Sequence, residues 1–378
     1  MVARTRLLQR LRGLAGLWFL LALYTNGLPL LFHYLGKRDT WLDTTATVGR
    51  IVLFVGPPLI GGLAFLILRW VRQRQDDFHH RLQDEGRTVF LLPRPDAPPV
   101  KVDRVGLWSR LADVIPRDEH ITFELAGGSE GVAFFTRSTE GVDRAILTQV
   151  MSEWPGTQAR PVEKPEDDPL SNDGEDGERT GWWVEVQPTG TERPIVASVP
   201  DPLMAILTEV ARLPEGVRGG LQVQVRGDPF TRRRLGKKAA RLTAQRAAGK
   251  SLEQKRGEKG LDARAQRLFL EARLIVWAVA GTEEMARSVA RSLARTLVAQ
   301  FGPSNPLRKA DEGAGAPTAR EFPLFAGKPW ADDELTAVAH LVGKDGRNVA
   351  PQLRVAPARS LPPSPESRVP RDARTVRK

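Results

Sequence analysis

A pattern of short strands and helices that occurs twice most constrains the fold of this chain. The first copy contains a strand at Thr88–Leu92, a helix at Leu107–Ile115, strands at Ile121–Leu125 and Val132–Phe135, a helix at Val142–Trp154 and an edge strand at Gln158–Val162. Apolar residues recur at helical spacing in the predicted helices and alternate with polar residues over 121–125. This βαββαβ order is typical of the ferredoxin-like arrangement.

The pattern starts again after residue 180. The second copy contains a strand at Trp182–Val186, a helix at Leu203–Leu213, a strand at Leu221–Val225, an apolar strand at Leu274–Ala280 and a helix whose apolar face carries Met285, Val289, Leu293, Leu297 and Phe301. Asp201 and Thr282 are predicted N-caps of the two helices. The segments Leu111–Pro116 and Glu209–Pro214 correspond in the two copies. We therefore predict an α+β protein with two ferredoxin-like units, whose helices cover one sheet face and leave the other for a partner or the other unit.

Two apolar runs near the N-terminus, 13–36 and 51–68, contain no Lys, Arg, Asp or Glu. Roughly 20 apolar residues cross a bilayer, so these runs predict two transmembrane helices. Arginines precede the first run and follow the second, which predicts a multi-pass protein of the inner, cytoplasmic membrane with both termini cytoplasmic. A cleaved signal peptide is the alternative for the first run, but no A-x-A site follows it.

The composition of the segments between and after the repeats sets the remaining boundaries. The predicted parts are a transmembrane hairpin at 1–72, a stalk at 73–86, the first ferredoxin-like unit at 87–163, an acidic linker at 164–180, the second unit at 181–310 with a basic insertion at 227–267, a C-terminal helical segment at 311–342 and a basic, proline-rich disordered tail at 343–378.

The residue types that carry most enzyme chemistry are scarce or badly spaced here. The chain has no cysteine, which excludes disulfides, Cys-ligated zinc and thiol catalysis. Its five histidines show no HExxH or other metal spacing, and no GxSxG motif occurs. We therefore predict a protein that is not an enzyme, with no catalytic residues, no cofactor and no metal.

Eight acids lie between Glu163 and Glu178, mixed with Pro, Asn and Gly. Calcium binding is one reading of this segment. The spacing of an EF-hand fails, however, because the fifth position counted from Asp173 is Gly177 and carries no oxygen ligand. The composition favours a solvated linker.

The basic insertion carries the candidate contacts of the chain with an anionic partner. The net charge is +11, and the selected cations are Arg232, Arg233, Arg234, Lys237, Lys238, Arg241 and Lys250, with Arg246 between them. Clustered cations bind nucleic acid or lipid phosphates. Because no aromatic residues lie among them to stack bases, a solvated helix is the favoured alternative. The segment Ala244–Ser251 also resembles a phosphate-binding loop, but no apolar strand precedes it.

Several segments together resemble the N-terminal region of membrane-anchored conjugation and type IV secretion ATPases of the HerA/FtsK-related class. The similarity lies in the predicted N-terminal hairpin, in the repeated units, in Leu274–Arg287, in Phe301–Leu307, and in the helix Asp333–Leu341 that precedes the proline-rich Ser360–Pro365. In that family a RecA-like motor follows such a junction, and no Walker residue is present here. The resemblance implies a hexamer around a pore.

From these features we expect a non-enzymatic, membrane-anchored platform of a conjugative DNA-transfer or type IV secretion machine. Its expected partners are the membrane, a translocating ATPase supplied by another chain, DNA or anionic lipid, and further copies of itself. Two alternatives remain open: an ATPase fragment whose motor is encoded in an adjacent reading frame, and a membrane-tethered nucleic-acid-binding protein.

Overall fold

The computed structural model describes residues 61–356 with internal gaps. The gaps are 64, 68, 71, 75, 84–85, 97–105, 117–118, 130, 163–167, 169, 171–179, 229–230, 232–233, 238–263, 265, 318–319, 321 and 324–325. The described residues fall into two compact units, one drawn from 61–81 and 322–327, and the other from 82–321 and 328–356. The larger unit contains all of the strands described below.

The smaller unit corrects the predicted localisation. Its described residues between 61 and 81 are helical, and they become charged at Arg69, Arg72 and Arg74. Within the part of the chain that the structure describes, no helix combines the length and the apolar character needed to cross a bilayer. This finding contradicts the predicted multi-pass membrane localisation. The first apolar run, and the second up to residue 60, lie outside the described residues.

The first half of the larger unit follows the predicted order of elements. It contains β1 (Arg87–Leu92), α3 (Leu107–Val114), β2 (His120–Gly128), β3 (Gly131–Ser138), α4 (Glu140–Glu153) and β4 (Gln158–Pro161). All neighbouring strands pair antiparallel, in the order β4-β1-β3-β2. Gly131, with φ of 153°, stands in the tight β2–β3 hairpin, a conformation that glycine adopts readily.

The second half has the same order and the same pairing. It contains β5 (Thr180–Pro188), α5 (Pro202–Ala211), β6 (Arg218–Gly227), β7 (Phe269–Ala280), α8 (Glu283–Ala299) and β8 (Leu307–Ala314). The strands pair antiparallel in the order β8-β5-β7-β6. The predicted caps are confirmed: Asp201 Oδ1 accepts from the backbone N–H of Leu203 at 3.0 Å, and Thr282 Oγ1 from that of Met285 at 3.3 Å.

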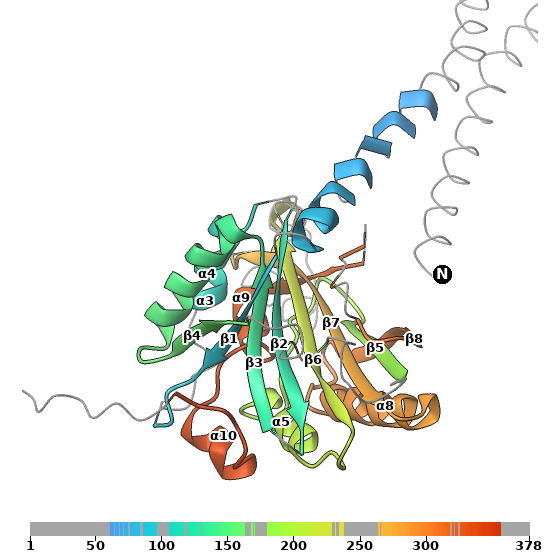
Figure 1. Cartoon of the computed structure of the whole chain (residues 1–378). Helices are drawn as coiled ribbons and strands as arrows, with labels where there is room; N and C mark the ends of the chain where they lie inside the picture. The colour runs from blue at the N-terminus through green and yellow to red at the C-terminus, as the bar shows by residue number, and fades with distance from the viewer. Residues whose placement is uncertain are drawn as a thin grey trace, which may run out of the picture. The chain divides into compact units, whose positions relative to one another are not determined.

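The two halves join edge to edge in one antiparallel sheet (Figure 1). Strand β2 pairs with β6 over their whole length, and Glu124 stands opposite Gln222 at the centre of the joint. These two residues are 98 residues apart, the spacing that also separates Pro116 from Pro214 in the repeat. The joint therefore relates the two copies by an approximate two-fold axis near Glu124. The second half thus meets the first through strand pairing, and not through the open sheet face that the sequence offered as a contact.

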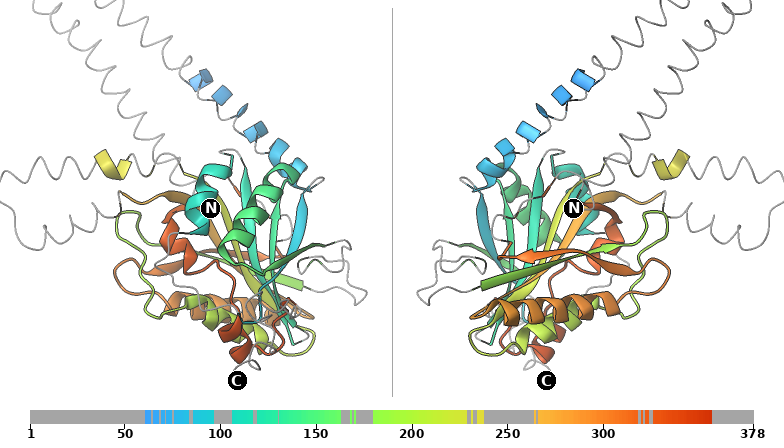
Figure 2. Two further views of the ribbon diagram at one scale, coloured as in Figure 1. Left: turned by 90° about the vertical axis from the view of Figure 1, so that its left-hand side faces the viewer. Right: turned by 90° about the vertical axis from the view of Figure 1, so that its right-hand side faces the viewer.

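Four helices, α3, α4, α5 and α8, pack on one face of the sheet and close a single apolar core across both halves. Figure 2 shows α5 and α8 lying side by side. The predicted apolar face of α8 is partly wrong, because Met285 is 47% exposed. Its buried face includes Ala286, Ala290 and Ala294 beside Leu293, and small side chains let this helix approach the sheet closely.

The opposite sheet face is closed by the chain's own segments. Ala126 and Ala133 of the first half and Trp277 of the second form a small apolar cluster with Phe135 and Leu170. Leu170 belongs to the acidic linker and is 1% exposed. The open face that we predicted for a partner is therefore occupied at its centre.

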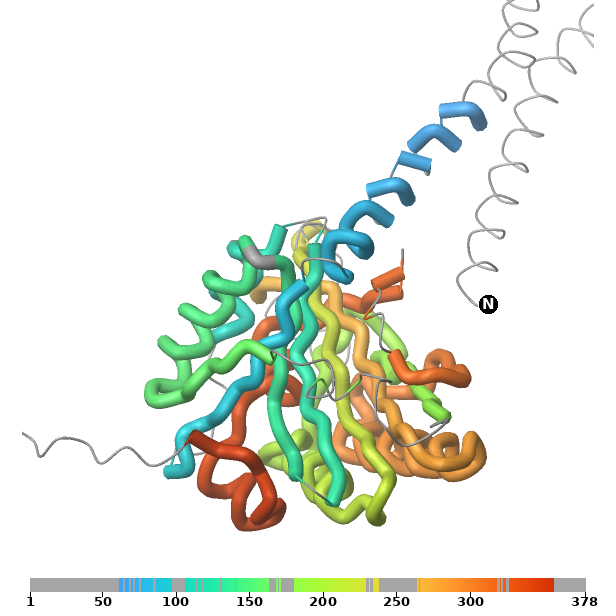
Figure 3. Tube along the Cα trace, viewed as in Figure 1, coloured from blue at the N-terminus to red at the C-terminus, as the bar shows by residue number. Residues whose placement is uncertain are grey.

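The C-terminal part differs from the prediction. In place of a helical segment at 311–342, the chain continues β8 to Ala314 and then forms β9 (Lys328–Ala331) and α9 (Asp332–Thr336). In place of a tail that is disordered from 343, α10 (Lys344–Val349) packs against α5. Leu353 is buried and bridges to Val132 of β3. Figure 3 shows the red C-terminal segment beside the strands of the first half. Residues 357–378 lie outside the described residues.

Candidate functional site

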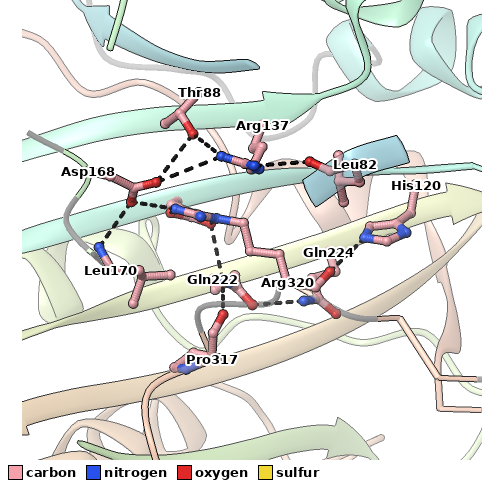
Figure 4. Close-up of polar contacts among 11 residues, drawn as sticks. Leu82, Thr88, His120, Arg137, Asp168, Leu170, Gln222, Gln224, Pro317 and Arg320 are labelled. Carbon is pink, nitrogen blue, oxygen red and sulfur yellow. Dashed lines mark hydrogen bonds and ion pairs between the residues drawn. The ribbon is translucent and has the colours of Figure 1, made fainter. Parts of the chain in front are cut away.

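The most connected polar feature lies on the second sheet face, around Arg320. Its Nε donates to Glu124 Oε1 at 2.6 Å, and its Nη2 donates to Glu124 Oε2 at 3.1 Å and to Asp168 Oδ1 at 2.7 Å (Figure 4). Arg137 lies nearby, with its Nη1 3.9 Å from Asp168 Oδ2. We call these four residues, Arg320, Glu124, Asp168 and Arg137, the Arg320 cluster. It brings together β2, β3, the acidic linker and the segment after β8.

Arg137 connects the cluster to the start of the larger unit. Its Nη1 donates to Thr88 Oγ1 at 2.8 Å, and its Nη2 donates to the carbonyl oxygen of Leu82 at 2.9 Å. Thr88 Oγ1 in turn donates to Asp168 Oδ2 at 3.4 Å. The carboxylate of Asp168 also accepts the backbone N–H of Leu170 at 3.0 Å, which fixes the turn that buries the leucine.

Glutamines at the centre of the joint complete the arrangement. Gln222 Nε2 donates to Glu124 Oε1 at 3.1 Å, so the two residues that face each other across the joint are also bonded through their side chains. Gln224 Nε2 donates to Gln222 Oε1 at 2.8 Å. The polar residues on this face thus run continuously from one half to the other.

The backbone of Arg320 is held in the left-handed region, with φ of 48°. This conformation is uncommon for a residue with a side chain and persists where surrounding contacts hold it. The ring Nε2 of His120 lies 2.7 Å from the Arg320 carbonyl oxygen, which accepts its N–H. Both ends of Arg320, backbone and side chain, are therefore anchored to β2.

Burial sets the electrostatics of the cluster. Burial lowers the pKa of Arg320, but the charges and hydrogen bonds of Glu124 and Asp168 outweigh it and hold that pKa above its usual value. Burial also lowers the pKa of Arg137, and the charge of Arg320 lowers it further. For Asp168 burial acts to raise the pKa, yet Arg320, the Leu170 N–H and Arg137 together hold it below its usual value. Arg320, Arg137 and Asp168 are therefore charged at neutral pH.

The chemistry available to these charges is limited. Both carboxylates have their oxygens engaged by guanidinium groups, and Glu124 and Arg320 are at most 4% exposed. A general base needs a lone pair that can reach a substrate proton, which Glu124 does not offer. The Arg320 cluster therefore functions as a structural clamp that fastens the linker and the segment after β8 over the joint.

A second buried ion pair closes the basic insertion. Arg264, at the end of the insertion, pairs with Glu334 of α9, and burial lowers the pKa of Arg264 to about 10. Glu334 also accepts the backbone N–H groups of Ile195 and Ala331, each at 2.8 Å. The end of the insertion at Arg264 is therefore held to α9 by a buried ion pair.

Only two of the predicted anionic-partner contacts fall on described residues. Arg234 and Lys237 lie in a helical stretch and are exposed, and Arg234 Nη2 donates to Thr191 Oγ1 at 3.2 Å. Arg232, Arg233, Lys238, Arg241, Arg246 and Lys250 lie outside the described residues. Among the described residues, no group of three or more His, Asp or Glu side chains is placed to hold a metal ion.

Sequence reasoning missed the Arg320 cluster. The composition predicts a solvated linker around Asp168, but the side chain of Asp168 is only 14% exposed. A usable signal was present in the strands, because Thr122 and Glu124 alternate with apolar residues in β2, and Gln222 and Gln224, which pair with them, alternate with apolar residues in β6. Nothing local to residue 320 marks it as the partner.

We expect Asp168→Asn to lower the free energy of unfolding at neutral pH by about 1.5–3 kcal/mol, the range for hydrogen bonds to charged groups. Because the folded pKa of Asp168 is below its unfolded value, its contribution is present above the unfolded pKa and is lost as the pH falls through the folded pKa. The difference in urea midpoint between wild type and variant should be full at about pH 6 and shrink below about pH 4. A difference that stays constant down to about pH 2 would contradict this assignment.

The chain was also compared with known proteins. No family model matches it, and no match to a curated protein is found.

Proposed function

We propose that this chain is a non-enzymatic docking component of a conjugative DNA-transfer or type IV secretion machine, acting beside a translocating ATPase that another chain supplies. The proposal treats each half of the larger unit as a ferredoxin-like unit, the arrangement that the βαββαβ order of the sequence predicts. Its support is the order βαββαβ in each half. Within each half the strands lie side by side in the order fourth, first, third, second.

The observation that carries the proposal is the joint between the halves. The β2–β6 pairing and the Arg320 cluster across it join the two halves into one sheet, whose edge strands β4 and β8 carry partly or fully exposed residues. A docking module needs this combination, because a partner bound at one edge of the sheet must be held at a fixed position relative to a partner bound at the other edge. Catalysis has no comparable support in the cluster, whose carboxylates are occupied.

Affinity purification tests the proposal. The tagged full-length chain is crosslinked in cells that carry the intact transfer locus, and the co-purified proteins are identified by mass spectrometry. We expect a RecA-like translocating ATPase of that locus, and no hydrolysis of ATP or GTP by the purified chain alone. Repeated recovery without any such ATPase, or turnover of nucleotide by the pure chain, contradicts the proposal.

Nucleic-acid binding is a second candidate function, favoured by the exposure of Arg234 and Lys237. If the basic insertion contacts DNA, retention of DNA by the full chain should fall with salt, because phosphate contacts release counterions. Each contact contributes about 0.9 to the slope of log affinity against log salt concentration. Changing Arg234 and Lys237 together to glutamine should therefore reduce that slope by about 2. An unchanged slope excludes these two residues as the contact.

A further inference from the structure

A groove of about 800 Å³ runs along α8 on the helix side of the second half. It is lined by Val184 of β5, by Lys309 of β8 and by residues from Glu284 to Ala299 of the helix. The helix has 17 residues, and at about 1.5 Å per residue the groove is long enough for an extended or helical peptide segment of similar length. Figure 1 shows α8 beside the edge of the sheet that β5 and β8 form.

The lining combines apolar surface with cations. Among its apolar lining residues Val298 is half-buried and Ala299 is exposed, whereas Val184 and Ala294 are buried. Arg287, Arg291 and Arg295 recur every fourth residue of the helix. Residues four apart lie on the same side of a helix, so the three guanidinium groups form one row beside the apolar lining.

Two of the arginines already have partners within the fold. The Arg287 guanidinium lies 4.1 Å from the centre of the Trp182 ring and also pairs with Glu283. Arg291 and Lys309 share Glu312, each at 2.7 Å, and the hydrogen bond from Arg291 is the largest influence that lowers the pKa of Glu312 to about 2. Arg295 is exposed and has no hydrogen-bond or ion-pair partner among the residues that the structure describes. It is therefore the cation left for a ligand.

The lining discriminates between classes of partner. A polyphosphate chain would meet Glu284 in the groove and Glu312 beside it. None of the ten described residues that line the groove is aromatic, so bases have no ring on which to stack. A peptide with apolar side chains on one face and carboxylates on the other matches both the apolar lining and the row of cations.

We propose that the groove along α8 docks an acidic, amphipathic segment of a partner protein. This inference rests on the proposed docking function and names the surface that performs it. The carboxylates of the segment pair with Arg295 and with the outer side of the arginine row, while its apolar side chains cover Val298 and Ala299.

Fluorescence anisotropy with the full-length chain tests this docking. The probe is a fluorescein-labelled synthetic helix of about 16 residues, with Leu and Ala on one face and Glu on the other. A probe of the same composition in scrambled order is the peptide control. The test variant is Arg295→Glu, which breaks no described contact, and the matched control is Arg144→Glu on α4, which reverses an exposed helical arginine far along the chain.

We expect the amphipathic probe to bind wild type more tightly than the scrambled one, and Arg295→Glu to raise its Kd about tenfold. Arg144→Glu should change the Kd less than about twofold. Thermal melts of both variants should match wild type, which excludes unfolding as the cause.

Three outcomes overturn the proposal. They are no preference for the amphipathic probe, equal losses in the two variants, and tighter binding of a labelled oligothymidylate that Arg295→Glu abolishes. The last outcome would assign the groove to nucleic acid. If the groove fails in these ways while the ATPase still co-purifies with the chain, the docking function stands and only its surface is wrong.

Discussion

Replacing Arg320 with leucine is expected to lower the free energy of unfolding by about 3–5 kcal/mol. The substitution leaves the carboxyl group of Glu124 fully buried without its counter-ion, and among the described residues only the amide of Gln222 still donates a side-chain hydrogen bond to it. A buried charge without its counter-ion is among the most destabilising features a fold can contain. Urea unfolding followed by tryptophan fluorescence measures the loss, and it should appear as a lower midpoint with an unchanged slope.

Two further variants separate the loss of the charge pair from the loss of packing. The double variant Glu124→Leu with Arg320→Leu removes both charges, so it should recover at least about half of the stability lost in the single variant. Arg144→Leu, an exposed arginine on α4, should remain within about 0.5 kcal/mol of wild type. If Arg320→Leu is as mild as Arg144→Leu, the Arg320 cluster is not a clamp.

Local patterns in the sequence were sufficient to predict most of the strands and helices of the larger unit. Alternation over 121–125 identified β2, and the stripe Leu203, Ile206, Leu207 and Val210 identified the buried face of α5. Caps such as Asp201 and Thr282 were predictable for the same reason, since each acts on backbone groups two or three residues away.

The joint between the halves was not predictable in this way. Strand pairing between β2 and β6 depends on two edges that the repeat exposes equally, and an exposed face was an equally reasonable contact for the second unit. Arg320 and Glu124 are 196 residues apart in the chain, so no periodicity links them. Asp168 has the same sequence surroundings as the other acids of the linker, and its burial depends on Arg320, which lies 152 residues away in the chain.

Small residues caused the error in the buried face of α8. The sequence predicts an apolar face of α8 that includes the large side chains of Met285 and Val289. The buried face instead includes Ala286 and Ala290. Hydrophobic periodicity weights residues by their apolar size. It therefore misplaces a helix whose packing depends on close approach, which alanine permits and methionine prevents.

Trp277→Ala is expected to lower the free energy of unfolding by about 3–5 kcal/mol, the usual loss for a buried aromatic residue. The Trp277 ring is fully buried, stands opposite Gly220 of β6 and packs with Leu170 on the second sheet face. Its removal opens a cavity at the joint and beneath the linker. Guanidinium unfolding followed by far-UV circular dichroism measures the change without relying on tryptophan fluorescence.

The conservative variants Trp277→Phe and Trp108→Phe make a matched comparison, because both indoles are at most 1% exposed. The Trp108 N–H donates to the carbonyl oxygen of Ala339 at 2.8 Å, whereas the Trp277 N–H has no hydrogen-bond partner in the described structure. Phenylalanine fills most of either site but donates no hydrogen bond. Trp108→Phe should therefore be the more destabilising of the two by about 1 kcal/mol, the net contribution of one hydrogen bond and of the carbonyl it leaves unpaired. Equal losses would mean that the Trp277 N–H has a partner in solution, and that the second sheet face admits water at the joint.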